Sequence, residues 1–351
     1  MTDYHNWKNK GDKRYEEQNF VVPLAEKVDG LDAILAAHTH TRIPQARING
    51  VLVVQPWYWG RGVSKVVFRA NQEGAVVSGK GEFLRASRSD LSGSIRRLAE
   101  PFHRATLDFV GSKIGSTTKA FDGGMPARFR DTALVDFINT VQLRMAKEAG
   151  HPAALSLASV FNDGSRLPAG DIRVSDVFAV YPYENTLTVM EITGDILRRA
   201  LEHTAAYWKR HSSTAPPRNL RRLVAAGARD YNWDLYVGVE YVLDISKPVG
   251  RRVVHLSCGG NPVTADRKLV LAVNNYRAGG GGGYGMFKEG RILWESSQQV
   301  RDYMIDYIRT HSPLDPEAYH VLNWRLAPFH RAAPEVQPAT PSRPVLPAPR
   351  R

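Results

Sequence analysis

The sequence Lys268-Leu269-Val270-Leu271-Ala272-Val273 runs directly into Asn274-Asn275-Tyr276-Arg277-Ala278 and then into five glycines, Gly279 to Gly283. The apolar run predicts a buried strand, and the strand opens into a loop that can adopt almost any backbone conformation. Tyr276 offers a flat ring for stacking, and Arg277 offers a fork of donors for anions. This pattern is typical of a site for a planar, charged small molecule, although an ordinary glycine-rich surface loop would have the same composition.

The size and charge of the chain limit its fold and its partners. The 351 residues predict two domains, each long enough to bury its own core. The net charge of +12 favours an anionic partner. The basic residues are spread along the chain, which argues against a nucleic acid polymer. No apolar run is long enough to cross a membrane, so we expect no membrane partner.

Cysteine content and the N-terminal sequence give little information on the compartment. The single cysteine, Cys258, excludes a disulfide within the chain and a cysteine-based zinc site. Residues 1–13 are polar and contain no apolar signal core, so no export signal is visible.

The periodicity of apolar residues predicts an α/β chain, with α+β organisation in its C-terminal domain. Residues 1–86 contain a helix over 14–28 and strands at 31–36, 51–55 and 63–68, and residues 87–108 form a charged helical connector. The second domain, 109–330, begins with a long helix over about 131–149. Further strands are predicted at 187–192, 236–245, 252–256 and 268–273, with a last helix at 300–308. The tail 331–351 is rich in proline and alanine and is predicted to be disordered.

Two histidines follow the strand at 31–36. In an extended segment the side chains at i and i+2 point the same way, so His38 and His40 could face one cleft and each hold one ion of a metal pair. A complete dinuclear site also requires carboxylates and further histidines, and the sequence before His38 has no recognisable ligand pattern of that kind.

Side chains at two further positions are candidates for ligand binding. Tyr183 lies directly before the strand at 187–192, and with Tyr276 it could enclose a planar base. The alternative is that both tyrosines cap the sheet. Arg128 lies just before the long helix and could hold a ribose or a phosphate, or could be a solvated basic residue.

Seven short stretches form a combined pattern over residues 14–310: Glu16-Glu17-Gln18-Asn19, 30–40 with His38-Thr39-His40, Pro168-Ala169-Gly170-Asp171-Ile172, Tyr181 to Asn185, Ile192-Thr193-Gly194, Tyr231-Asn232-Trp233-Asp234, and Asn274 to Gly283. In this order they resemble the 5′-nucleotidase family, and most closely its 2′,3′-cyclic-nucleotide 2′-phosphodiesterase/3′-nucleotidase branch. The resemblance implies the last part of a calcineurin-like metallophosphatase domain, a helical connector and a 5′-nucleotidase C-terminal domain that binds the nucleoside.

The resemblance also implies roles for single residues. Tyr183 and Tyr276 match the aromatic pair that encloses the base, and Asn185 matches the asparagine after the first aromatic residue. Further residues are matched as follows: Arg128 to a substrate-binding arginine, Arg166 approximately to a second one, Arg277 and Gly280 to the glycine-rich binding loop, and His38 and His40 to two ligands of the metal pair. The aspartate that binds ribose in other 5′-nucleotidases falls at Gly282.

The resemblance implies a nucleotide or nucleoside ligand and a divalent metal pair of Mn, Co, Zn or Mg. The motifs that supply the other metal ligands lie upstream of where this sequence starts, so we expect that the chain alone does not retain the pair and that an N-terminal half is missing. The resembled family is mostly periplasmic or exported. Three functions remain open: metal-assisted hydrolysis of nucleotide phosphoesters, nucleoside binding without hydrolysis, and a basic scaffold without a small ligand.

Overall fold

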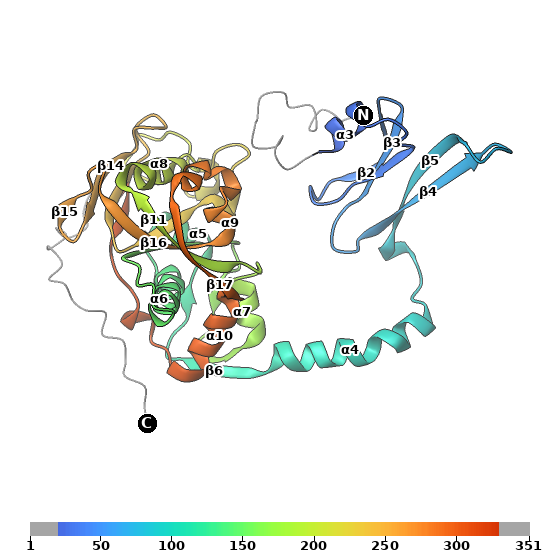
Figure 1. Ribbon diagram of the computed structural model, residues 1–351. Coiled ribbons are helices and arrows are strands. Elements are labelled where there is room, and N and C mark those ends of the chain that lie inside the picture. The colour runs from blue at the N-terminus through green and yellow to red at the C-terminus, as the bar shows by residue number, and fades with distance from the viewer. Residues whose placement is uncertain (1–19, 330–351) are drawn as a thin grey trace. The chain divides into compact units, whose positions relative to one another are not determined.

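The computed structural model describes residues 20–329, and Figure 1 shows their helices and strands. The chain divides into two compact units, the first ending at Phe102 and the second beginning at His103. Each unit has its own sheets and its own buried cluster. No helix within the described range 20–329 has the length and apolar character needed to span a bilayer.

The first unit contains a short helix and a small sheet. The elements are α3 (Val21–Lys27), β1 (Ala33–Leu35), β2 (Arg42–Ile48) and β3 (Val51–Pro56), and the sheet order is β1-β3-β2. β1 runs parallel to β3, and β2 runs antiparallel to it. The central strand β3 is buried over residues 51–55, as its continuous apolar sequence predicts.

A ribbon of two strands follows the small sheet. β4 (Gly62–Ala70) and β5 (Val76–Arg85) pair antiparallel, and the short helix η1 (Ala86–Arg88) leads on to α4 (Gly93–Gly111). The helix α4 corresponds to the helical pattern predicted around residues 87–108. It buries none of its residues.

A five-stranded mixed sheet forms the centre of the second unit. Its order is β12-β8-β16-β11-β17, and the strands are β8 (Leu155–Ser159), β11 (Thr186–Thr193), β12 (Asp234–Val237), β16 (Lys268–Asn274) and β17 (Arg291–Gln299). β8 and β16 are parallel, and the other neighbours are antiparallel. This arrangement confirms the predicted strand that opens into the glycine run.

Helices cover the sheet of the second unit. They are α5 (Gly124–Phe129), α6 (Ala133–Glu148), α7 (Val174–Val180), α8 (Gly194–Ala205), α9 (Asn275–Ala278) and α10 (Val300–His311). The helix α6 packs on β8 and α10. Its predicted apolar face is confirmed, since the following side chains are all buried: Leu134, Phe137, Ile138, Val141 and Met145. The Thr193 hydroxyl caps α8 by accepting from the Ile196 amide at 3.3 Å.

A second sheet has the order β15-β14-β13-β18, formed by β13 (Glu240–Asp244), β14 (Val253–Cys258), β15 (Asn261–Pro262) and β18 (Trp324–Ala327). Two smaller pairs are β6 (Lys113–Thr117) with β10 (Gly170–Arg173), and β7 (Phe121–Asp122) with β9 (Arg166–Leu167). Short 3-10 helices are η2 (Leu220–Leu223), η3 (Asp230–Asn232), η4 (Gly281–Gly283), η5 (Gly285–Glu289) and η6 (Pro316–Ala318). Together these elements confirm the predicted mixed α/β class.

Some predicted elements differ from the structure. The strand predicted over 236–245 is two strands, because Gly238 turns the chain at φ +86° and a Cβ there would lie 2.1 Å from the Ala154 carbonyl oxygen. The strands β2, β5, β8 and β17 were not predicted, since their sequences are short or mix polar and apolar residues. Residues 14–19 of the first predicted helix and the tail 331–351 lie outside the described residues.

Candidate functional site

One edge of the five-stranded sheet brings together the ends of four strands. β8 and β16 run parallel and both end at this edge, whereas their antiparallel neighbours β12 and β11 begin there. The segments just beyond the strand ends carry Phe161, Tyr231, Tyr183 and Tyr276. Loops outside the carboxyl ends of parallel strands are a common place for ligands in α/β sheets. The topology therefore collects four aromatic side chains at one edge.

Tyr183 is partly exposed and contacts two other aromatic rings. Its side chain is 44% exposed. The ring of Phe161 meets it edge-on at 5.0 Å between centroids, and the ring of Tyr231 does so at 6.4 Å. Partial burial, with a smaller contribution from Tyr231, raises the pKa of the Tyr183 hydroxyl. The side chain is therefore a neutral, rigid ring with a face available to a ligand.

Tyr276 lies on α9, and its ring rests on the backbone of the glycine run. A Cβ at Gly281 would lie 2.4 Å from the ring atom Cε2 of Tyr276, so only glycine permits this contact. Gly280, directly before it, has the left-handed φ of +84°. Tyr276 remains 41% exposed. Among the described residues no ring contact joins Tyr183 to Tyr276, so neither ring covers the other.

Arg277, predicted as a fork for anions, is buried and bonded within the protein. Its Nε donates to Asp234 Oδ2 at 2.7 Å. Its terminal nitrogens donate to the carbonyl oxygens of Gly281, at 3.1 Å, and Tyr231. Asp234 is itself fully buried. The ion pair thus ties the glycine run to the segment that carries Tyr231.

Arg128 is likewise fully buried, in a network of two arginines and two aspartates. It bonds to Asp163 at 2.5 Å and lies 3.6 Å from Asp230. Arg221 bonds to both aspartates, at 2.8 Å for its contact with Asp230 Oδ1. Burial acts to raise the pKa of each carboxyl, but the hydrogen bonds from Arg221 and its neighbours hold both pKa values below their usual range. The network therefore fixes Asp163 and Asp230, which lie beside Phe161 and Tyr231 in sequence.

The remaining residues assigned by sequence lie around the same sheet or near it. Asn185 is partly buried at the start of β11, where its carbonyl accepts from the Val300 amide at 2.9 Å. Arg166 is exposed on β9. The sequence does not reveal Phe161 as a site residue, because β8 was not predicted. Tyr231 and Asp234 belong to the motif Tyr231-Asn232-Trp233-Asp234 but were not assigned to the site. That motif is the signal that could have identified them.

The two histidines have a different setting in the first unit. His38 and His40 have left-handed φ values of +72° and +55°, so the prediction of an extended segment is wrong. His40 stacks on Tyr58 at 5.0 Å. Within residues 20–329, no group of three close histidine, cysteine or carboxylate ligands includes His38 or His40. The described donor set therefore does not by itself fit a metal pair.

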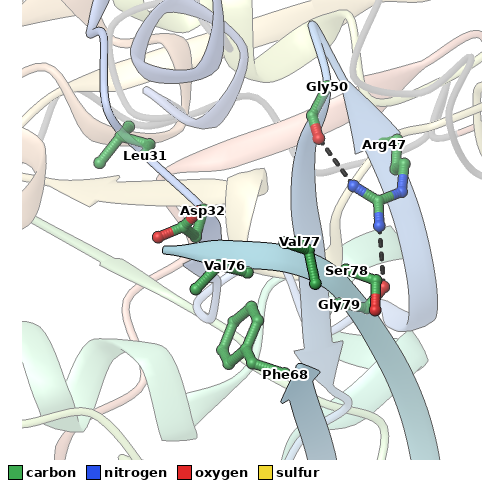
Figure 2. A pocket seen from close by; sticks show the side chains of 9 residues that line it. All are labelled: Leu31, Asp32, Arg47, Gly50, Phe68, Val76, Val77, Ser78 and Gly79. Carbon is green, nitrogen blue, oxygen red and sulfur yellow. Dashed lines mark hydrogen bonds between the residues drawn. The ribbon is translucent and has the colours of Figure 1, made fainter. Parts of the chain in front are cut away.

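The first unit also contains a small polar hollow of about 170 Å³, shown in Figure 2. Arg47 spans it and donates to the carbonyl oxygens of Gly50, at 2.7 Å, and Gly79, at 2.8 Å. Its lining includes neither His38 nor His40. Because the guanidinium is used to tie the β2–β3 turn to β5, the hollow serves the packing of this unit.

Comparison with known proteins identifies the family. The sequence pattern described as 5′-nucleotidase, C-terminal domain matches residues 113–289, about half of the chain. The chain belongs to this family. The 5′-nucleotidase C-terminal domain of the chain contains Tyr183, Tyr276 and the buried pair Arg277–Asp234.

Relatives of known sequence support the same assignment. The chain is 26% identical to the trifunctional nucleotide phosphoesterase protein YfkN of Bacillus subtilis, over 89% of the chain and 24% of YfkN. It is also 26% identical to the 2′,3′-cyclic-nucleotide 2′-phosphodiesterase/3′-nucleotidase of Yersinia enterocolitica, over 92% of the chain and 58% of that protein. The chain thus spans between a quarter and somewhat more than half of the length of these relatives.

Solved structures share the fold. A Staphylococcus aureus structure assigned as a candidate 5′-nucleotidase superposes with a TM-score of 0.64 at 22% identity, covering 86% of the chain and 57% of that protein. A 5′-nucleotidase precursor from Thermus thermophilus gives a TM-score of 0.52 at 21% identity, covering 91% and 62%. At these identities the comparison establishes the fold.

Proposed function

We propose that the second unit binds the base of a nucleoside or nucleotide between Tyr183 and Tyr276. The observation that carries this proposal is the placement of two tyrosine rings, 44% and 41% exposed, at one edge of the central sheet. A base stacked on each ring gains about 1–3 kcal/mol. Stacking tolerates every base, so the site is expected to discriminate weakly among them.

The buried charged residues hold the segments that form this site. Arg277 and Asp234 hold the glycine run, including Gly280, against the segment of Tyr231. Arg128 is fully buried and bonded to Asp163, so we assign it to fixing the walls of the site rather than to direct contact with a phosphate. Asn185, at the start of β11, is the polar side chain assigned to the edge of the bound base.

The activity that we propose from the family resemblance is metal-dependent hydrolysis of nucleotide phosphoesters, of the 2′,3′-cyclic phosphodiesterase/3′-nucleotidase type. The names of the Bacillus and Yersinia relatives, a nucleotide phosphoesterase and a cyclic-nucleotide phosphodiesterase/3′-nucleotidase, support this class. His38 and His40 would hold one ion each of a divalent metal pair, which would supply an activated water. Since no group of three close ligand side chains in the described residues includes His38 or His40, we propose that the chain alone binds nucleotides without turnover. A periplasmic or exported location remains part of this proposal.

Calorimetric titration with adenosine and 3′-AMP tests the binding site. We expect Tyr183→Ala and Tyr276→Ala each to weaken binding by about 1–3 kcal/mol, and the corresponding Phe variants to bind almost normally, because the ring face makes the contact. Tyr303→Ala, on α10, is the matched control for loss of a partly buried tyrosine. Unchanged affinity in both Ala variants would mean that the two tyrosines cap the sheet and do not bind the base.

Phosphate release separates binding from hydrolysis. Assays with 3′-AMP and 2′,3′-cyclic AMP in the presence of Mn²⁺ or Co²⁺ should give little or no phosphate from the chain alone. Turnover that disappears in His40→Ala would show that the chain is a competent enzyme. A chain that neither binds nucleosides nor releases phosphate would favour the basic scaffold.

A further inference from the structure

Three metal-binding side chains meet in the second unit, in a cluster formed by Asp131, Asp136 and His320. Asp131 lies just before α6, Asp136 lies in its first turn, and His320 follows η6 on the way to β18. One ligand atom from each of the three lies within 4.8 Å of the other two. Residues almost two hundred positions apart in the sequence are thus brought together by the tertiary fold.

The two carboxylates are buried without a counter-ion. Asp131 is 8% exposed and Asp136 is 3% exposed. In the described part of the chain, no lysine or arginine pairs with either one, and no direct ion pair joins either to His320. Two buried negative charges at this distance are unfavourable unless a proton or a cation lies between them.

Backbone amides orient the carboxylates. The Val321 amide donates to Asp136 Oδ2 at 2.9 Å, and the Asn323 amide donates to Asp131 Oδ2 at 3.2 Å. Each bond holds one carboxylate oxygen in place, and N–H groups of Thr132 and Trp324 also act on the Asp131 carboxylate. Hydrogen bonds of this kind set the direction of metal ligands in protein sites.

One buried polar group beside the carboxylates has no hydrogen-bond partner, and it is a separate indication that a group is missing here. The Thr132 hydroxyl, next to Asp131 in sequence, is buried and unpaired. The indole N–H of Trp324 is also buried and is directed at the Asp131 carboxylate as its acceptor, where it and the Asn323 amide act against the burial that raises the pKa of Asp131 to about 7. Buried polar groups are normally paired, so an ion with its bound water would satisfy this site.

We propose that Asp131, Asp136 and His320 bind one divalent transition-metal ion, Zn²⁺ or Mn²⁺. Two carboxylate oxygens and one imidazole nitrogen are ligands that both ions accept. His320 is exposed, which gives the ion a route to the buried carboxylates. This site belongs to the second unit and is separate from the histidine pair of the first unit.

The ion would act as a structural clamp. It would fasten the segment that begins at His320 to the start of α6, and this segment continues into β18, which completes the second sheet beside β13. A ligand that binds only the folded chain stabilises it by mass action. The clamp therefore predicts a metal-dependent melting temperature that is independent of nucleoside binding.

Thermal melting of the tag-free full chain, stripped of metal and then titrated with Zn²⁺ or Mn²⁺ alone, tests the proposal. At about one hundred times the dissociation constant, we expect the melting temperature to rise by about 5–10 °C. His320→Ala and Asp136→Asn should each weaken the metal by more than about 10-fold. His255→Ala, which removes an exposed histidine on β14, should respond like the unmodified chain.

The Asp136→Asn variant keeps the test decisive. Its side-chain amide resembles a protonated carboxyl group, so the variant should fold without metal. Bound metal measured by mass spectrometry after dialysis should approach one equivalent in the unmodified chain and fall in both variants. No shift in melting temperature at millimolar metal, or the same shift in His320→Ala, would overturn the proposal. In that case a shared proton alone neutralises the pair, consistent with burial and the Asp131 charge raising the pKa of Asp136 to about 9.

Discussion

The histidine loop of the first unit and the tyrosine edge of the second unit are both built from aromatic side chains on loops beyond strands, but their backbones differ. In the described residues, every non-glycine residue with a left-handed φ lies in the first unit, including His38, His40, Trp57 and Trp59. In the second unit only glycines adopt such angles. A bulky residue in this region costs on the order of 1–3 kcal/mol and persists only where its surroundings impose it.

This contrast indicates which of the two sites is held in place by its own unit. At the tyrosine edge, the glycines, the buried pair Arg277–Asp234 and the arginine network satisfy the geometry from within the same unit. The histidine loop has the stacking of His40 on Tyr58 and the bonds between Thr39 and Gln55. We therefore expect the second unit to be preorganised and the first to need further partners.

The largest expected effect is in the folding of the isolated units. A fragment over 109–330 should show one cooperative thermal transition, and a fragment over 1–100 should show none. Among its described residues, the first unit has a cluster of five buried apolar side chains, whereas the cluster of the second unit draws on nearly all of its strands and helices. A cooperative transition from 1–100 together with none from 109–330 would reverse the comparison.

The next effect concerns the buried ion pair. Arg277→Met should destabilise the second unit by about 3–5 kcal/mol in urea unfolding, because it leaves the fully buried Asp234 without its partner. Adding Asp234→Asn should restore part of the loss. Arg291→Ala, which removes a pair between exposed Arg291 and Glu191, should cost less than about 1 kcal/mol. Equal losses in the two arginine variants would mean that the pair does not hold the loop.

A smaller effect is expected on binding alone. Gly281→Ala places a methyl group where the Tyr276 ring lies, so the ring must move and nucleoside binding should weaken by about 1–3 kcal/mol. Gly285→Ala is the matched control, since a Cβ there meets nothing within 4 Å. Titration with adenosine and a melting curve for each variant separate lost affinity from lost stability. If both variants bind normally, Tyr276 is not part of the site.

The smallest effect is the response to acid. The pKa values of Asp163 and Asp230 are lowered in the folded chain, so their stabilising contribution is complete above the ordinary carboxyl pKa of about 3.9 and is lost as the pH falls through the lowered values. Arg221→Met should cost about 1 kcal/mol at pH 7, because these groups are partly solvated. In the same variant, the unfolding free energy should fall less between pH 7 and pH 3 than it does in the unmodified chain.

Arg218→Met, a change at an exposed neighbouring arginine, controls for the lost positive charge. An acid response in Arg221→Met identical to that of the unmodified chain would place the acid-sensitive groups elsewhere. The relevant measurement is the difference in unfolding free energy between pH 7 and pH 3.

The sequence predicted much of the site because local chemistry marks it. The apolar run before Asn274, the aromatic at Tyr183 and the glycine run are readable without a fold. It could not predict that Phe161 backs Tyr183, since that contact depends on the parallel pairing of β8 with β16. Nor could it predict the direction of the imidazoles of His38 and His40, because i and i+2 share a direction only in an extended chain.

The mixed α/β class and the family can be recognised from the sequence, because periodicity, glycine runs and short motifs are local properties, and the tyrosine pair is a prediction of the same kind. Which charged side chains are free to bind a ligand and which are paired within the protein depends on the tertiary structure. In the sequence, Arg277 and Arg128 look like guanidinium groups available to an anion. In the structure, each one forms an ion pair with an aspartate from a distant segment. The same applies to His320, which lies near Asp131 and Asp136 only in the folded chain. Burial and the pairing of charges depend on contacts between distant segments, and those contacts exist only in the folded chain.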